Sequence, residues 1–144
     1  MLVKQILKMK GSDDVVTVRP DHTVSDVVKM LSEKRIGTVV VSGDGARADG
    51  ILSERDIVRE IGKRGTECLM ETAGDMMTKN PTTCAPDDTT DAVLGQMTDG
   101  RFRHIPVMDG ETMVGLISIG DVVKARLSEL EGEKTALESM IMGH

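Results

Sequence analysis

GILSERDIVR, at residues 50–59, has a near-copy in GLISIGDVVK, at residues 115–124. In each stretch a glycine and two aliphatic residues precede a serine, and an aspartate follows that serine by three positions at the start of an apolar run. This order is a variant of the capping box, in which the serine and the acid each bond the other's backbone N–H at a helix N-terminus. Each stretch therefore predicts a short strand that leads into a capped helix.

The similarity of the two halves extends beyond these stretches. VTVRPDHTVSDVVKML (16–31) aligns with TTCAPDDTTDAVLGQM (82–97), and RIGTVVV (35–41) aligns with RFRHIPV (101–107), both at an offset of 66 positions. The opening stretches align at 65, so the loop that precedes them is one residue shorter in the second copy. A nearly constant internal offset indicates a repeated structural unit.

Each copy is predicted to form a strand, a helix, two further strands and a second helix. In the first copy VVTVR (15–19) is rich in β-branched residues, and Thr23 is a candidate N-cap for a helix with apolar residues at helical spacing. GTVVV (37–41) and GILS (50–53) are apolar strands separated by a polar loop, and DIVREI (56–61) continues as the second helix. The order of elements in each copy is therefore β-α-β-β-α.

The copies leave segments at both ends and between them. Residues 9–62 and 76–127 are assigned to the two repeats, with a polar, glycine-containing linker over 63–75. An amphipathic lead-in helix is predicted over residues 1–8, and a helical tail over residues 128–144. Each repeat alone is near the lower size limit for a stable core, so the two are expected to pack on each other.

The tail carries an incomplete heptad pattern. Leu127, Leu130, Leu137 and Ile141 recur at heptad spacing, and we expect Gly132 to interrupt the helix. The tail is interpreted as a packing or dimer element. Because the apolar positions of the two second helices and of the tail need partners, the chain is expected to form a homodimer.

Composition excludes some classes of partner. The 144-residue chain is 39% hydrophobic and has a formal net charge of −6, which disfavours nonspecific binding of nucleic acid or of an anionic membrane. No apolar run approaches the length of about eighteen residues that a membrane helix needs. With one Phe and neither Trp nor Tyr, a flat ligand would be held by aliphatic side chains, methionines and backbone.

The cysteines and histidines suggest no metal centre and no catalytic centre. Cys68 and Cys84 are the only cysteines, and their spacing matches no metal motif. Because no signal peptide is recognisable, we expect a cytoplasmic protein with free thiols. His22, His104 and His144 are scattered and accompany no catalytic motif, so an enzyme is not expected.

The tandem pattern as a whole resembles the CBS domain family, whose modules occur in pairs. The resemblance rests on the order of elements, on the V-x-P-D-x-T sequence at 18–23 and on both G-h-h-S-x-x-D segments, where h is aliphatic. It implies an α/β fold of the α+β type, with two β-α-β-β-α repeats packed through their sheets in pseudo-two-fold symmetry as a Bateman module. It also implies clefts between the repeats that bind adenosine nucleotides.

The resemblance assigns roles to the two capping boxes. It implies that Asp56 and Asp121 bind ribose and that Ser53 and Ser118 lie on the phosphate side. These roles are compatible with capping, because a helix N-terminus attracts phosphate and a carboxylate can accept both ribose hydroxyls.

The resemblance also implies that the first strands meet the adenine and that the second strands begin with phosphate-binding side chains. The further candidate nucleotide-binding residues are Thr17, Arg19, Gly37, Thr38, Arg55, Thr83, Ala85, Arg103, His104 and Pro106. Arg35 and Arg101 are interpreted instead as solvated cations at helix ends. Pro106 also predicts an edge or irregular strand. Because the copies differ at several of these positions, two equivalent sites are not expected.

The sequence therefore predicts a non-enzymatic regulatory module, with no metal and no effector domain, that senses AMP, ATP or NAD(H). Ligand binding would shift the arrangement of the module or dimer, and an unidentified protein target would respond to it. The alternatives are a ligand-free dimerisation scaffold, in which both aspartates are ordinary caps, and a nucleotide-processing enzyme.

Overall fold

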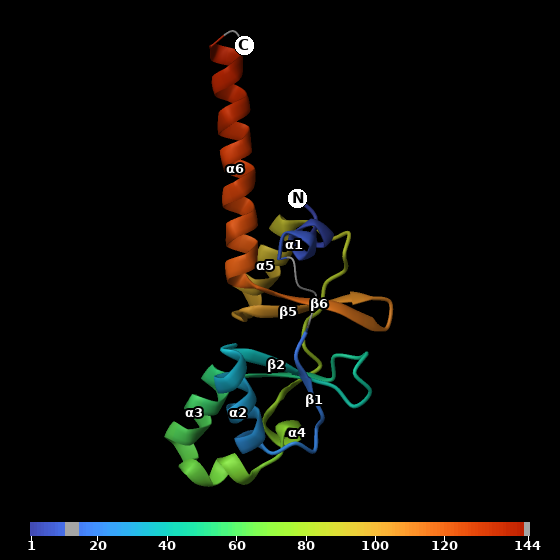
Figure 1. Cartoon of the computed structure of the whole chain (residues 1–144), viewed down its shortest axis with the longest axis vertical. Helices are drawn as coiled ribbons and strands as arrows, with labels where there is room; N and C mark the ends of the chain where they lie inside the picture. The colour runs from blue at the N-terminus through green and yellow to red at the C-terminus, as the bar shows by residue number, and fades with distance from the viewer. Residues whose placement is uncertain (11–14, 143–144) are drawn as a thin grey trace.

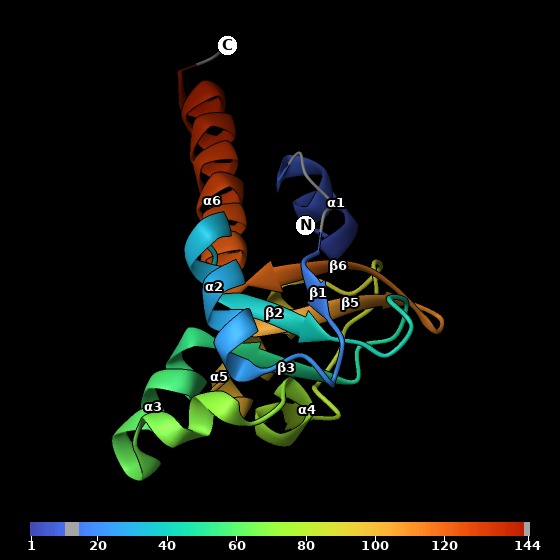
Figure 2. The same ribbon diagram turned by 60° about the horizontal axis from the view of Figure 1, so that its bottom comes forward.

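Two similar units of helices and strands stack on each other in the computed structural model, which describes residues 1–10 and 15–142 (Figure 1). The strands of the two units lie next to each other in the middle of the molecule, and the helices cover their outer sides (Figures 1 and 2). The predicted α+β class, with two repeats packed through their sheets, is confirmed. His144 lies outside the described residues.

The first unit is built on a four-stranded sheet. It contains β1 (Thr17–Val18), α2 (Val24–Lys34), β2 (Thr38–Val41), β3 (Gly50–Ser53) and α3 (Glu54–Arg64). β1 is parallel to β2, β3 is antiparallel to β2, and β4 (Thr78–Lys79) pairs with the other edge of β3. Thr23 caps α2 as predicted, since its side chain accepts a hydrogen bond from the backbone N–H of Asp26. β1 is shorter than the predicted strand because it pairs only with the last two residues of β2.

The second unit has a more irregular sheet. It contains α5 (Thr90–Gly100), β5 (His104–Asp109), β6 (Thr112–Ser118) and α6 (Ile119–Ile141). Its expected first strand is reduced to one parallel bridge between Cys84 and Val107, and the pairing of β5 with β6 shifts register after Val107. Pro106, which has no N–H to donate, precedes this shift, so the prediction of an irregular strand there is confirmed.

The internal offset of the sequence is reproduced in the backbone. Arg35 and Arg101 both end a helix in the left-handed conformation, at φ 54° and φ 56°. The N–H of Glu54 donates to the carbonyl of Gly37 at 2.8 Å, and the N–H of Ile119 donates to that of Arg103 at the same distance. The two units are therefore related by approximate two-fold symmetry in detail.

Each unit is completed by a short helix from the segment that precedes the first strand of the other unit. α1 (Val3–Lys10) packs on the second unit, where the N–H of Val3 donates to the carbonyl of Asp88 at 2.9 Å. α4 (Ala73–Met76) packs on the first unit, where the N–H of Ala73 donates to the carbonyl of His22 at 2.7 Å. The predicted linker over 63–75 thus contains a 3₁₀ helix over Thr66–Met70 and all of α4 except its last residue.

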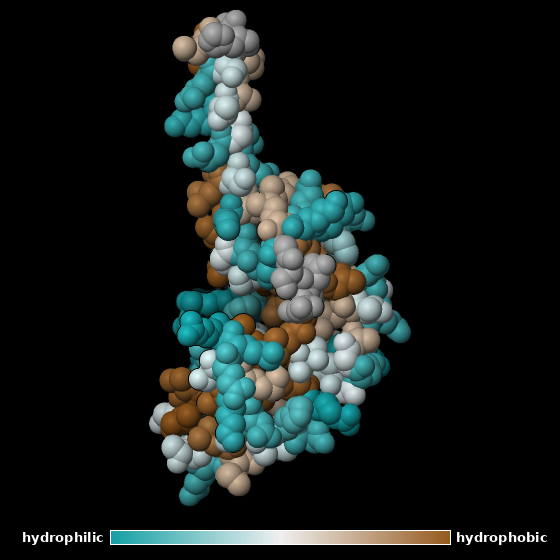
Figure 3. Space-filling model, in the orientation of Figure 1, coloured by the Kyte–Doolittle hydropathy of each residue, from teal (hydrophilic) through white to brown (hydrophobic). Residues whose placement is uncertain are grey.

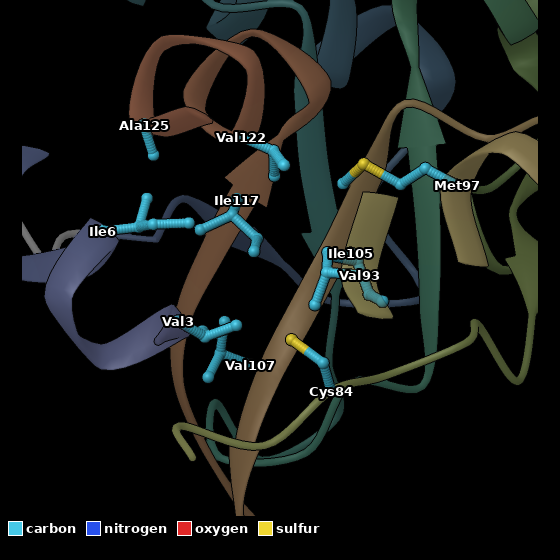
Figure 4. Close-up of a cluster of buried hydrophobic side chains, with 10 residues drawn as sticks. All are labelled: Val3, Ile6, Cys84, Val93, Met97, Ile105, Val107, Ile117, Val122 and Ala125. Carbon is cyan, nitrogen blue, oxygen red and sulfur yellow. The ribbon is translucent and has the colours of Figure 1, made fainter. Parts of the chain in front are cut away.

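The exchange is visible in the two hydrophobic cores. Val3 and Ile6 of α1 join the core of the second unit, where Ile6 lies beside Ile117 and Val3 beside Val107 (Figure 4). Ala73 of α4 joins the core of the first unit, which is otherwise made of aliphatic residues from β1 to α3. The cores consist of aliphatic side chains, methionine and cysteine, as the composition predicts.

Both cysteines are free, as predicted from the sequence, and both are buried. Burial is the main cause that raises the pKa of the Cys84 thiol to about 12. Cys84 therefore packs as a neutral side chain in the second core.

The terminal helix is continuous, so the predicted interruption at Gly132 is wrong. α6 runs for 23 residues from Ile119 to Ile141. A single glycine inside a helix reduces helix stability by only about 1 kcal/mol relative to alanine, and the flanking turns are stable enough to keep the helix continuous. Among the described residues, no helix is both long enough and apolar enough to cross a membrane.

Candidate functional site

Two clefts open where the sheets of the two units meet, and they share a wall. Thr38, the first residue of β2, faces His104, the first residue of β5, with 3.2 Å between Thr38 Oγ1 and His104 Nδ1. Thr38, His104 and Gly37 line both clefts. Because Thr38 and His104 are equivalent positions of the repeat, their contact lies near the approximate two-fold axis.

The larger cleft measures about 710 Å³, which is within the usual range for small-molecule sites. It brings together candidate residues from both repeats. These are Gly37, Thr38, Ser53, Arg55 and Asp56 of the first and Arg103 and His104 of the second. Phe102, the one aromatic residue of the sequence, also lines it.

Ser53 and Asp56 form the predicted capping box of α3, on the rim of the larger cleft. Asp56 Oδ2 accepts hydrogen bonds from the backbone N–H of Ser53 at 3.0 Å and from its hydroxyl at 2.8 Å. Asp56 Oδ1 accepts from Arg59 Nη2 at 2.8 Å, and the Arg59 side chain is 55% exposed. One carboxylate oxygen therefore holds the cap, while the other pairs with an exposed surface cation.

The lining of the larger cleft carries an excess of positive charge. Four arginines, Arg55, Arg59, Arg101 and Arg103, line it with only two carboxylates, Glu54 and Asp56. Of these four, only Arg59 forms an ion pair within residues 1–10 and 15–142. The cleft can therefore attract an anion, although the whole chain is acidic.

Two of these arginines were not among the sequence candidates. Arg101 does end α5, as the helix-end interpretation requires, but it also lines the larger cleft. Arg59 was missed, although its spacing from Arg55 and Asp56 places all three on one side of the α3 N-terminus. Helical spacing from a known candidate is the signal that could have identified it.

The smaller cleft, of about 270 Å³, lies against the second capping box. Asp121 Oδ2 accepts from the N–H of Ser118 at 2.8 Å and pairs with Lys10 Nζ at 2.9 Å. Lys10 also donates to the carbonyl of Leu116 at 2.7 Å. Burial favours the neutral acid, but the Ser118 N–H and the Lys10 ammonium outweigh it and hold the pKa of Asp121 below its ordinary value.

Lys10 makes the two clefts different. It is the last residue of α1, which precedes the first strand of the first repeat, and nothing in the sequence pattern points to it. Its ammonium occupies the carboxylate that the resemblance assigns to ribose, and the volume of this cleft falls below the usual range for small-molecule sites. The expectation of two inequivalent sites agrees with this geometry.

His104 lies between the clefts as a largely neutral group. Burial is the main cause that lowers its pKa below the ordinary value; Asp121 opposes this effect, whereas Lys10 and Arg103 add to it. His104 is therefore suited to accept or donate a hydrogen bond near neutral pH, and not to supply a fixed positive charge.

Five sequence candidates line neither cleft: Thr17, Arg19, Thr83, Ala85 and Pro106. For two of the five the preceding residue lines a cleft instead: Val16 precedes Thr17 and lines the smaller cleft, and Thr82 precedes Thr83 and lines the larger. Successive side chains of an extended segment point to opposite sides, so an error of one position can change the side.

Comparison with known proteins matches this architecture. The family model "CBS domain" matches residues 3–63 and 73–128. The mitochondrial CBS domain-containing protein CBSX3 of Arabidopsis thaliana is 34% identical over 98% of this chain and 72% of its own length. Several other curated relatives are longer, and the chain spans 20–22% of their length.

Solved structures agree. A CBS-domain containing protein from Agrobacterium tumefaciens is 43% identical, with a TM-score of 0.81 over 88% of this chain and 99% of that one. A CBS domain protein from Pyrobaculum aerophilum, complexed with AMP, shares the fold with a TM-score of 0.73 at 24% identity, covering 84% of this chain and 89% of that one. The chain belongs to the CBS domain family, of which it contains two tandem repeats.

Proposed function

We propose that the chain is a regulatory module that binds an adenine nucleotide, such as AMP, ATP or NAD(H), in the larger cleft. The observation that carries this proposal is the meeting of Ser53 and Asp56 from one repeat with Arg101 and Arg103 from the other in one cleft of about 710 Å³. The AMP complex of the protein from Pyrobaculum aerophilum supports the ligand class.

Each part of a nucleotide has a chemical partner in this cleft. Asp56 can accept hydrogen bonds from the ribose hydroxyls once Arg59 leaves it and pairs with the phosphate. Breaking the ion pair between Asp56 and Arg59 costs little free energy, because the Arg59 side chain is exposed. Arg101 and Arg103 supply permanent charge for phosphate. Ile51, Pro81 and Phe102 offer apolar surface for the base.

Binding would be coupled to regulation because the ligand bridges the two units. A nucleotide held by Asp56 at one end and Arg103 at the other favours the arrangement in which these residues are close, and its differential affinity sets the size of the population shift. A homodimer and a protein target that responds to this shift complete the proposal. It includes no catalytic step.

The first test is thermal melting with a panel of adenine nucleotides. A ligand that binds only the folded state stabilises it by RT ln(1 + [L]/Kd), so a hundredfold excess over Kd should add about 2.7 kcal/mol. Guanine nucleotides at the same concentrations are the control for nonspecific anion effects. No shift with any adenine nucleotide would favour the ligand-free scaffold, and release of product beyond one equivalent would identify an enzyme.

Arg103→Ala should lower affinity for AMP by about tenfold while affinity for adenosine changes little, because only AMP carries the phosphate. Arg19→Ala is the matched control, since Arg19 is exposed and lines neither cleft. Calorimetric titration of both ligands gives the result. An equal loss for AMP and adenosine would mean that Arg103 shapes the pocket and does not bind phosphate.

A further inference from the structure

The terminal helix presents an apolar stripe that its own unit leaves uncovered. Val122 and Ala125 of α6 are buried against the second unit. A different side of the helix carries Val123, Leu127 and Leu130, which are 44%, 58% and 46% exposed. Figure 1 shows that α6 continues far beyond the second unit, and hydrophobic surface lies along its outer side where it leaves that unit (Figure 3).

The stripe has strict heptad spacing along the helix. Its positions alternate as d and a, in the order Val123, Leu127, Leu130, Lys134, Leu137 and Ile141. Lys134 is the one charged residue in this series. The stripe is flanked on one side by Lys124, Glu131 and Glu138 at e, and on the other by Arg126, Glu133 and Met140 at g.

A parallel pair of these helices would bring like charges together. Lys134 would face the partner's Lys134 in the core, which is unfavourable for two ammonium groups in an apolar seam. At the flanks, g of one helix meets the next e of the other. Arg126 would then attract the partner's Glu131, but Glu133 would face the partner's Glu138.

One antiparallel register resolves these conflicts. With Leu127 opposite the partner's Leu130, Lys124 lies beside the partner's Glu131, and Arg126 beside the partner's Glu133. Two-fold symmetry repeats each attractive pair. Lys134 moves to the end of the seam, opposite the partner's Val123, where its ammonium can reach solvent and the Glu138 carboxylate 4.0 Å away.

The neighbouring antiparallel registers are worse. A shift by one heptad toward the C-terminus brings Lys124 beside the partner's Glu138, but it also places Glu131 beside the partner's Glu131 and Glu133 beside the partner's Glu133, whereas the chosen register has no repulsive pair. A shift the other way places Lys124 beside the partner's Lys124, and Arg126 beside the partner's Arg126. The charge pattern therefore selects one register, in which the seam from Val123 to Lys134 is roughly 17 Å long at about 1.5 Å per residue.

We propose that α6 docks on α6 of a second copy as an antiparallel pair, centred where Leu127 meets the partner's Leu130. This inference rests on the homodimer of the proposed function and defines its interface. It does not depend on nucleotide binding, so sedimentation tests it independently of the melting experiment.

The test is the dimer dissociation constant of the full chain, measured by sedimentation. Leu130→Glu should raise it by roughly a hundredfold or more, because two carboxylates enter an apolar seam. Met70→Glu is the matched control, since Met70 is 79% exposed but lies at the end of the 3₁₀ helix over Thr66–Met70, far from α6 in the sequence. A monomeric parent, or a dimer that Met70→Glu dissociates and Leu130→Glu does not, would overturn the proposal.

Glu133→Arg distinguishes the two orientations. In the antiparallel pair the introduced guanidinium would face the partner's Arg126 and weaken the dimer by about tenfold over two symmetric contacts. In a parallel pair the same change would replace repulsion of the partner's Glu138 by attraction, and the dimer would tighten. Adding Lys124→Glu to Glu131→Lys supplies a second reversal: Glu131→Lys alone should weaken the antiparallel dimer by facing the partner's Lys124, and the double change should restore the parental constant. Circular dichroism of each variant verifies the fold. A tighter dimer for Glu133→Arg, or no restoration by the double change, would exclude the antiparallel register.

Discussion

Asp56→Ala is expected to weaken AMP binding by about ten- to a hundredfold. A hydrogen bond to a charged group contributes roughly 1.5–3 kcal/mol, which corresponds to this range of affinity. The Asp56 side chain is 17% exposed on the rim of the larger cleft, and only the exposed Arg59 competes for Oδ1. We therefore expect the loss in the dissociation constant from calorimetric titration, with unchanged stoichiometry.

Loss of a helix cap must be separated from loss of a ligand contact. Asp56 is the acid of the α3 capping box, and removing such an interaction costs about 1 kcal/mol of stability. Asp75→Ala removes the equivalent acid from the capping box of α4, and Asp75 lines neither cleft. Asp75→Ala should therefore reproduce the destabilisation and keep AMP affinity.

Asp121→Ala is the second comparison, because Asp121 holds the equivalent position in the smaller cleft. There Lys10 already occupies its carboxylate, and the cleft measures only about 270 Å³. AMP affinity should therefore stay within about twofold of the parent. Unchanged affinity for Asp56→Ala on folded protein would remove the ribose role, and a loss for Asp121→Ala alone would move the site to the smaller cleft.

Local patterns carried most of the sequence prediction. The capping boxes at Ser53 and Ser118 are formed as expected, because each involves residues three positions apart in one turn. The strands predicted at 37–41 and 50–53 are formed, and the internal offset reappears in their pairing, since Thr38 pairs with Ser53 as His104 pairs with Ser118. These features depend on spacing, which a sequence records directly.

The remaining features depend on contacts between distant segments. Helical spacing shows that one side of the N-terminal segment is apolar, but not that Val3 and Ile6 pack on the second repeat. For the same reason no sequence pattern indicates that Lys10 reaches Asp121, which lies 111 positions further along the chain. The side of an extended segment that faces a cleft also changes with a shift of one position, as Thr82 and Thr83 illustrate.

Ile6→Ala is expected to destabilise the protein by about 2–5 kcal/mol, although Ile6 lies in a lead-in segment before the first repeat. Its side chain is 2% exposed and packs among residues of the second unit, which begins more than seventy positions later (Figure 4). Truncation would leave a cavity beside Ile117, because a packed core relaxes only partly around a missing side chain. Chemical denaturation of parent and variant measures the difference.

Met9→Ala is the matched control in the same helix. Met9 is 50% exposed, so its truncation should change the free energy of unfolding by less than about 0.5 kcal/mol. Hydrogen exchange of the backbone amides then shows which unit loses stability. Because α1 packs on the second unit, Ile6→Ala should reduce protection of β5 and β6 before that of β2 and β3. Reduced protection confined to the first unit would mean that α1 stabilises the repeat that follows it in the sequence, and equal effects of the two substitutions would mean that α1 is not part of either core.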